Sequence, residues 1–281
     1  MWRRASRLFA LSMLLAATPL GSVSAGPDKV TIPLFQNPNT ITTAGSIATI
    51  RTIRFLTTDD YPPFNFIDQE GRLGGFNIAL ARAVCLEIKA RCTMQALAWE
   101  NLQDALDRGQ GDAIIAGIAV SDKSVRRLAF TEPYLRIPAR FFAARGFAEA
   151  PSPGWPDRIS VGVQAGTAHE AFLKAFFPKA QLMTFADQSA LHAAVRSGAA
   201  TLGFSDGVGI AFWFQSGDAA GCCDFVGGPY LNADYFGPGV SIAMPLDRPD
   251  LKEVLDEALR RLTRKGTFSE IFLRSFPVSF F

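Results

Sequence analysis

Strand and helix patterns alternate twice along this chain, and that repeat constrains the fold more than any other feature. Short runs of β-branched and apolar residues predict strands, and apolar residues at three- and four-residue spacing predict helices. Each repeat reads strand, helix, strand, helix, strand, which is typical of an α/β sheet with parallel strands. The first repeat predicts strands at 50–57, 92–98 and 112–120 and helices at 75–90 and 99–108; the second predicts strands at 159–164, 182–185 and 200–205 and helices at 168–177 and 188–197.

Two such repeats imply two α/β lobes. A link rich in Pro, Ser and Gly at 148–156 lies between them, and a strand is expected before it, at 137–144. A cleft between two lobes is a usual place for a small ligand. After the second repeat the sequence predicts a strand at 240–245 and helices at 251–265 and 268–276.

The first 25 residues have the pattern of a secretory signal peptide. Three arginines precede an apolar run at 8–20, and small residues at 23–25 form a cleavage site. An uncleaved membrane anchor is the alternative, although the run is short for a membrane span. No cysteine lies near the cleavage site, so no lipid anchor is expected. Residues 26–49 are polar and are interpreted as an extended arm.

The charge balance gives no reason to expect a nucleic-acid partner. The whole chain has 28 Lys and Arg against 26 Asp and Glu. Three of the basic residues and none of the acidic ones lie in the signal peptide, so residues 26–281 carry a net charge of −1. Without a basic field, binding of nucleic acid is not expected.

Four cysteines in an exported chain favour disulfides. The spacing of Cys85 and Cys92 suits a bridge from a helix end to the next strand. Cys222 and Cys223 are adjacent, and either a vicinal disulfide or a pair of thiols in a turn would fit. No Cys/His spacing is typical of a zinc site, so no metal or other cofactor is expected.

The stretch at 57–77 should place side chains at an edge of the first sheet. Two acids and Tyr61 follow directly after the first strand, and two prolines stiffen the turn because proline fixes φ and restricts the residue before it. Open α/β sheets bind small ligands at the carboxyl ends of their strands. The turn at 164–169 should face the same cleft. An ordinary exposed β-turn is the alternative for the first stretch.

A series of short motifs in a fixed order runs through residues 50–281. The motifs are Tyr61-Pro62-Pro63-Phe64, Gly75-Phe76-Asn77-Ile78-Ala79-Leu80-Ala81, Cys85 to Cys92, Trp99-x-x-Leu102, Gly111-Asp112-Ala113-Ile114-Ile115-Ala116-Gly117, Phe130-Thr131-Glu132-Pro133-Tyr134, Val161-Gly162-Val163-Gln164-x-Gly166-Thr167 and Gly203-Phe204-Ser205-Asp206. With them the chain resembles the type 3 periplasmic solute-binding proteins, the polar amino-acid-binding subunits of ABC importers. It is similar to the histidine- and lysine/arginine/ornithine-binding proteins among them.

The resemblance implies an α/β, two-lobed periplasmic-binding-protein fold of type II, with two lobes joined by two hinge strands. Residues 50–136 and 235–281 would form the first lobe, and residues 137–234 the second. It also implies roles for single residues. An Asp at the place of Asp206 takes the ligand's α-ammonium group, although a turn or helix-cap role is the alternative.

Aromatic and acidic positions of the family also have counterparts here. Tyr61 and Trp99 match positions that sandwich the ligand side chain, since an aromatic face buries area and can hold a cation. Core packing is the alternative, especially for Trp99. Asp59 and Asp60 bracket an acid that meets a cationic side chain in the basic amino-acid binders, and a turn role is their alternative.

The sequence departs from the family where the ligand carboxylate would bind. Gly117 and Ala119 lie where backbone and hydroxyl groups meet that carboxylate, yet alanine has no hydroxyl. The family's carboxylate-clamping Arg falls on Ser124, and a bidentate guanidinium is the strongest part of such a site. An α-amino acid should therefore bind weakly unless Arg126 or Arg127 reaches in. A solvated face is the alternative for both arginines.

The second lobe departs from the family as well. After Gly166 and Thr167, the family's Thr and its polar partner are replaced by Ala168 and His169. Thr167 and the N–H groups at that helix start would still suit an anion. We therefore expect a small polar ligand, either an amino acid, a modified amino acid or an amine.

These features predict a monomeric periplasmic solute-binding subunit that delivers its ligand to an inner-membrane ABC permease. Residues 203–207 match the hydrolase motif G-x-S-x-G, but the required later histidine is missing because His192 precedes the serine. A dehydratase or lyase on the same scaffold, or a non-transport sensor module, is the alternative. The groups that could serve such an enzyme as general acid are Asp59, Asp60, Glu132 and His169.

Overall fold

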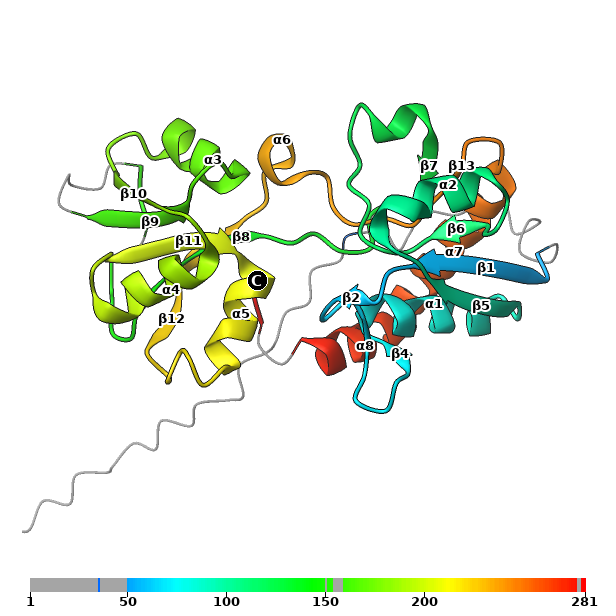
Figure 1. Ribbon diagram of the computed structural model, residues 1–281, viewed down its shortest axis with the longest axis horizontal. Helices are drawn as coiled ribbons and strands as arrows, with labels where there is room; N and C mark the ends of the chain where they lie inside the picture. The colour runs from blue at the N-terminus through cyan, green and yellow to red at the C-terminus, as the bar shows by residue number, and fades with distance from the viewer. Residues whose placement is uncertain (1–34, 36–49, 150, 154–158, 277–278) are drawn as a thin grey trace, which may run out of the picture. The chain divides into compact units, whose positions relative to one another are not determined.

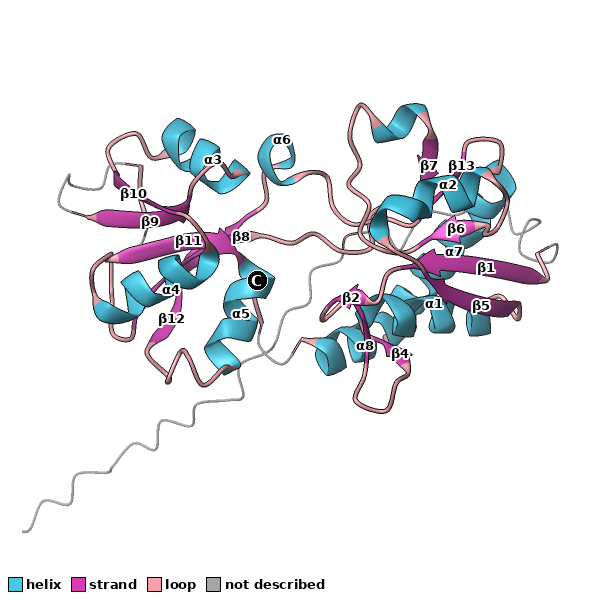
Figure 2. Cartoon of the chain, in the orientation of Figure 1, coloured by secondary structure: helices cyan, strands magenta, loops and turns pink. Residues whose placement is uncertain are grey.

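A computed structural model describes residues 35, 50–149, 151–153, 159–276 and 279–281 (Figure 1). The predicted signal peptide lies outside these residues, and of the predicted arm only Phe35 is described. Within the described part, no helix combines the length and apolar character that crossing a membrane requires. Helices and strands alternate as expected (Figure 2).

The first five-stranded sheet combines segments from both ends of the described chain. Its order is β5-β1-β6-β13-β7. β1 runs parallel to β5 and β6, whereas β13 runs antiparallel to β6 and β7. The strands are β1 (Thr52–Thr57), β5 (Arg91–Ala96), β6 (Ala113–Ile114), β7 (Leu128–Phe130) and β13 (Ala243–Pro245).

The prediction of a strand at 112–120 is wrong in its length. β6 ends at Ile114, and the backbone then turns at Gly117, whose φ of +80° is a left-handed value that glycine adopts readily. Ala119 returns to an isolated antiparallel bridge with Val240. The residues of this apolar run are buried up to Ala116, and a loop follows. The predicted strand was too long because periodicity alone does not locate a glycine turn.

The second five-stranded sheet has the order β10-β9-β11-β8-β12. β9 runs parallel to β10 and β11, whereas β8 lies antiparallel between β11 and β12. The second sheet therefore has the same arrangement as the first, with three neighbouring parallel strands followed by two strands that pair antiparallel. They are β8 (Ala139–Ala144), β9 (Ser160–Gln164), β10 (Gln181–Phe185), β11 (Leu202–Asp206) and β12 (Cys223–Tyr230).

Helices cover both faces of each sheet, which buries the apolar strands on two sides. On the first sheet, one cluster lies under α1 (Phe76–Glu87), α7 (Pro249–Arg264) and α8 (Thr267–Ser275), and another lies under α2 (Leu102–Asp107). On the second sheet, the helices are α3 (Ala168–Phe176), α4 (Gln188–Ser197) and α5 (Gly207–Gln215), with the short α6 (Ala233–Phe236) after β12. Two 3-10 turns, η1 (Trp99–Asn101) and η2 (Ser124–Arg126), complete the list.

Two extended connections join the sheets. One runs from β7 to β8 and the other from β12 to β13, and they meet at an antiparallel bridge between Leu135 and Val240. The Val240 N–H donates to the Leu135 carbonyl at 2.7 Å. A side chain at Gly239 would place its Cβ 2.7 Å from that same carbonyl, so the close approach requires glycine. The expected pair of hinge strands is therefore present. The exact lobe boundaries stay a prediction.

Both pairs of cysteines form disulfides. Cys85, in α1, is bonded to Cys92, in β5, which confirms the expected bridge. Cys222 and Cys223 form a vicinal disulfide, so the structure selects that alternative over two thiols. Cys223 is buried among α4 and α5 side chains.

Candidate functional site

Tyr61 occupies the turn of a small hairpin beside the first sheet. The hairpin is made of β2 (Asp60–Tyr61) and β3 (Asn65–Ile67), and β4 (Leu73–Gly74) pairs with β3 to complete a three-stranded antiparallel sheet. The Phe64 N–H donates to the Tyr61 carbonyl at 2.9 Å, which closes the two-proline turn. The ring of Tyr61 stacks on that of Phe64, with centroids 5.0 Å apart, yet Tyr61 remains 46% exposed.

A buried chain of hydrogen bonds holds this turn in place. The Tyr134 hydroxyl donates to Asn77 at 2.8 Å, Asn77 donates to Asn65 at 2.9 Å, and Asn65 donates to the Thr58 hydroxyl at 2.6 Å. All four residues are buried, and the hydrogen bonds between successive side chains give their polar groups the partners that burial requires. Because Thr58 and Asn65 flank the turn, the network fixes the backbone on either side of Tyr61.

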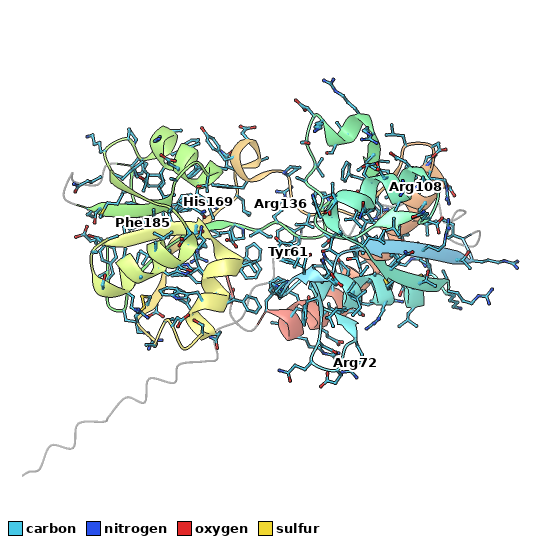
Figure 3. The ribbon with its side chains drawn as sticks, in the orientation of Figure 1. Tyr61, Arg72, Arg108, Arg136, His169 and Phe185 are labelled. Atoms are coloured by element: carbon cyan, nitrogen blue, oxygen red, sulfur yellow. A yellow bond between two sulfur atoms is a disulfide. The ribbon has the colours of Figure 1, made fainter. Side chains whose placement is uncertain are left out.

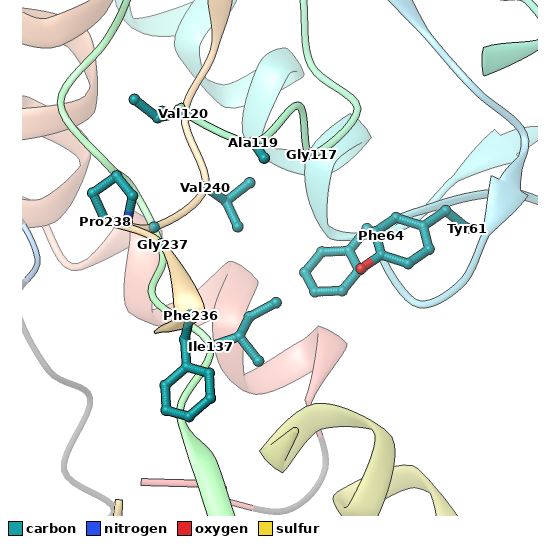
Figure 4. Close-up of a pocket in the computed structure, with 11 residues that line it drawn as sticks. Tyr61, Phe64, Gly117, Ala119, Val120, Ile137, Phe236, Gly237, Pro238 and Val240 are labelled. Carbon is teal, nitrogen blue, oxygen red and sulfur yellow. The ribbon is translucent and has the colours of Figure 1, made fainter. Parts of the chain in front are cut away.

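Three pockets share Tyr61 as a wall. The first lies beside the bridged connections and is apolar apart from the Tyr61 hydroxyl and backbone groups. In Figure 4 the rings of Tyr61 and Phe64 face Ile137 and Val240. The described lining residues are Tyr61, Phe64, Gly117, Ala119, Val120, Ile137, Phe236, Gly237, Pro238, Gly239 and Val240.

A second pocket is lined by one acid and two aromatic residues. It is lined by Thr58, Asp60, Tyr61, Trp99, Ala116 and Gly117, all from the region of the first sheet. Trp99 opens η1 and is 54% exposed, so it is not part of the core. Tyr61 contributes its ring, and a Cβ at Gly117 would lie 3.5 Å from it.

A third pocket brings Asp206 to the other side of Tyr61. Its described lining residues are Tyr61, Pro62, Pro63, Phe64, Ile137, Asp206, Val208, Gly209 and Phe212. Asp206 ends β11 and is the N-cap of α5, where its Oδ1 accepts from the Gly209 N–H at 2.7 Å. The cap role weighed against ligand binding is therefore present, and it uses one carboxylate oxygen. The Asp206 charge adds to burial in raising the pKa of Tyr61.

The Ser124 loop is closed by its own hydrogen bonds. The Ser124 hydroxyl donates to the Ala119 carbonyl at 2.8 Å and accepts from the Ser121 N–H at 2.9 Å. Arg127 pairs with Asp107 at 2.6 Å, and Arg126 is exposed at the end of η2. Neither arginine lines any of the three pockets. Hydrogen bonds of Ser124 therefore stabilise the loop, and neither of its two arginines lines these pockets.

The helix start after β9 is satisfied by the side chains of α3. Thr167 is the N-cap and accepts from the Glu170 N–H at 3.3 Å, while the Glu170 carboxylate accepts from the Gly166 N–H at 2.7 Å. This is close to a capping box. The Glu170 carboxylate therefore already accepts from one of the N–H groups near the helix start where we expected an external anion.

The remaining predicted residues lie apart from the three pockets. Ala168 is exposed, and Asp59 is exposed just before β2. His169 stacks on Phe236 at 5.1 Å and meets Phe204 edge-on, beside the second sheet (Figure 3). Burial lowers the pKa of His169, an effect that Asp206 opposes. His169 therefore contacts Phe236, a residue that lines the first pocket. A ligand-binding role for Asp59, Ser124, Thr167, Ala168 and His169 stays a prediction.

Several lining residues were not foreseen from the sequence. Ile137, Phe212 and residues 236–240 reach the pockets through the connections and α5. The run Gly237-Pro238-Gly239 was the available signal, since two glycines around a proline indicate a tight connection. Among the described residues, no group of three or more His, Cys, Asp or Glu could hold a metal ion.

Comparisons with known proteins identify the family and the fold. The family model for bacterial extracellular solute-binding proteins, family 3, matches residues 53–278. The ABC transporter arginine-binding protein 1 of Escherichia coli strain K12 is 27% identical over 225 residues, which cover 80% of this chain and 90% of that protein.

Solved structures share the fold at low sequence identity. The unliganded L-cystine solute receptor of Neisseria gonorrhoeae has a TM-score of 0.73 at 17% identity, covering 82% of this chain and 94% of that one. An ancestral cyclohexadienyl dehydratase has a TM-score of 0.65 at 19% identity, covering 81% and 93%. These likenesses confirm the expected two-lobed fold, and the chain belongs to the bacterial extracellular solute-binding proteins of family 3.

Proposed function

We propose that this protein captures a small polar solute, an amino acid or a related amine, in the periplasm and delivers it to an inner-membrane ABC permease. The observation that carries the proposal is the convergence of three pockets on Tyr61, with Asp60 on one side and Asp206 on the other. An acid beside exposed aromatic rings is suited to a cationic group. Family membership and the arginine-binding relative support the same function.

The mechanism we propose is closure of two lobes about the paired connections. Ligand first contacts the hairpin and η1 of the first lobe, where Tyr61 and Trp99 are exposed. The second lobe then brings Asp206 to it. Closure is favoured only by contacts that the closed form adds. A charge pair between Asp206 and the ligand that forms only on closure would therefore stabilise the closed form. The bridge between Leu135 and Val240 lies where the backbone would bend.

An enzymatic function on this scaffold gains no support from two of its four candidate acids. Glu132 accepts from the buried Arg260 at 3.1 Å, and its own N–H donates to Asp256. His169 is packed among aromatic rings. The curated relative is a binding protein. Asp59 and Asp60 remain exposed, and binding alone accounts for Asp60 as a pocket wall.

The proposal is tested by a thermal-shift screen of the secreted chain against amino acids, amines and small organic acids. A ligand that binds only the folded state raises the melting temperature by mass action. We expect hits that calorimetry confirms as one site per chain and that mass spectrometry recovers unchanged. Uptake of the hit should fail in cells lacking the gene. Turnover of the hit, or normal uptake without the gene, would contradict an importer function. Size-exclusion chromatography checks the predicted monomer.

A further inference from the structure

The charged side chains that line the three pockets are all acidic. Asp60 lines the pocket with Trp99, and Asp206 lines the pocket with Phe212. None of the described lining residues is Lys, Arg or His. No charged side chain is among the described residues that line the pocket beside the connections. The described lining therefore offers two negative charges, several aromatic and apolar side chains and no positive charge.

Some of the groups that could hold an anion near these walls have partners of their own, and the others are not among the described lining residues. The Ser124 hydroxyl closes its own loop, Arg127 pairs with Asp107, and the Gly166 N–H is occupied by Glu170. Arg126 and Arg136 are exposed and line none of the three pockets. A carboxylate in this site would lie near two like charges, and none of the described lining residues would give it a counter-ion.

A positive group meets the opposite conditions. Asp206 uses Oδ1 for the Gly209 N–H, and no described protein donor contacts Oδ2. Asp60 lines one pocket together with Tyr61 and Trp99, two exposed aromatic residues, and aromatic faces attract cations. A ligand with an apolar stem and one positive group for each acid would match all three pockets.

We propose that the ligand is an organic amine that carries no free carboxylate, rather than an α-amino acid. This rests on the proposed function, because it assumes that the pockets around Tyr61 are the solute site. Two carboxylates and no base are best complemented by a compound with two positive charges. The aliphatic segment between those charges would contact Tyr61, Phe64 and Ile137.

Matched pairs of compounds that differ only by the α-carboxylate test the proposal. Calorimetric titration of the secreted chain uses agmatine against L-arginine, cadaverine against L-lysine and putrescine against L-ornithine. We expect the amine of the best pair to bind at least about tenfold more tightly than its amino acid, since an uncompensated charge typically costs that much or more. Equal or tighter binding of the amino acids would overturn the amine assignment and leave the solute-binding function intact. Binding of neither class would overturn the amine assignment as well.

Variants that remove one negative charge test whether Asp60 and Asp206 bind the amine. Asp206→Asn keeps a side-chain oxygen for the α5 cap, because Asn caps helices as well as Asp does. Asp206→Asn and Asp60→Asn should each weaken amine binding by roughly tenfold or more. They should weaken it much more than they weaken amino-acid binding. Asp224→Asn is the matched control, since Asp224 is exposed on β12, pairs with Arg145 at 3.5 Å and lines none of these pockets. Equal losses in Asp224→Asn and the two site variants would reject the site.

Discussion

The two sheets have the same arrangement of strands, but the polar residues at their strand ends have different roles. After β1, the chain presents Asp60 and Tyr61 to pockets, and Trp99 after β5 is more than half exposed. After β9 and β11, by contrast, Thr167 and Asp206 cap the helices that follow. The first helix of the first sheet, α1, has Gly75 at its N-cap position and therefore no side-chain cap.

This difference suggests that the contacts with the ligand are divided unequally between the two halves of the molecule. The region of the first sheet would provide most of the contact surface, held by the buried network behind Tyr61. The region of the second sheet would contribute mainly one carboxylate and the rim of α5. Four predictions, from the largest expected effect to the smallest, examine this division.

Removing the shared wall should have the largest effect. Tyr61→Ala is expected to weaken ligand binding by about 2–3 kcal/mol, roughly 30- to 150-fold, because Tyr61 borders all three pockets. Phe212→Ala, on the second-sheet side, should cost less than about 1 kcal/mol because it borders one pocket only. Tyr61→Phe keeps the ring as a control. Calorimetry measures all three, and a larger loss for Phe212→Ala would reverse the proposed division.

The two disulfides should differ in their effect on stability. Replacing Cys85 and Cys92 by Ser releases a loop of separation 7, which should lower the free energy of unfolding by about 2 kcal/mol on a chain-entropy estimate. The same change at Cys222 and Cys223 frees almost no chain and should cost less than about 1 kcal/mol. Denaturant unfolding measures both. Equal losses would mean that packing around Cys223 matters more than loop closure.

Acid should destabilise the half of the molecule that holds both histidines. His192 stacks on Trp213 at 4.3 Å, and burial lowers its pKa from 6.5 to about 4. Below pH 6.5 the unfolded chain takes up this proton first, so the stability is complete above pH 6.5 and falls towards pH 4. After allowance for partial solvent exposure, we expect a loss of up to about 2 kcal/mol.

The variant His192→Phe isolates this term, because it keeps a ring against Trp213 but cannot titrate. Its stability should depend less on pH between 6.5 and 4 than that of the unchanged chain, as followed by denaturant midpoints. An unchanged pH dependence would assign the acid sensitivity to other groups, including His169, whose pKa is also lowered by burial.

The smallest effect is expected at the α3 cap. Thr167→Ala should lower stability by about 1 kcal/mol, since the Glu170 N–H loses its acceptor. Thr167→Ser keeps the hydroxyl and serves as the control. If the threonine is committed to the cap, ligand affinity changes little in either variant. A selective loss of affinity in Thr167→Ala, with stability retained, would instead place Thr167 in the binding site.

The sequence predicted most of the fold because alternating periodicity is a local signal. The strand and helix order, the Cys85–Cys92 bridge and the paired connections all followed from local pattern or from family resemblance. The strand at 112–120 failed because the turn at Gly117 depends on a backbone conformation that periodicity does not report. The packing of Phe280 in one cluster with Val208 and Ala211 of α5 is a long-range contact that no local pattern encodes.

The candidate site was predictable in part for a related reason. Asp60, Tyr61, Trp99, Gly117, Ala119 and Asp206 were named from the sequence and do line the pockets. Ser124 and Thr167 were named as well, but their hydroxyls complete local hydrogen bonds, and a sequence does not reveal which polar group is already satisfied. Ile137 and Phe212 depend on how distant segments meet.

The most direct test of the account is a crystal structure with the tightest-binding compound of the calorimetric series. We expect that compound to lie against the Tyr61 ring, with a nitrogen within hydrogen-bonding distance of the Asp206 carboxylate and no carboxylate of its own. A ligand bound outside the three pockets that share Tyr61, or one held there by a carboxylate paired with a basic side chain, would contradict it.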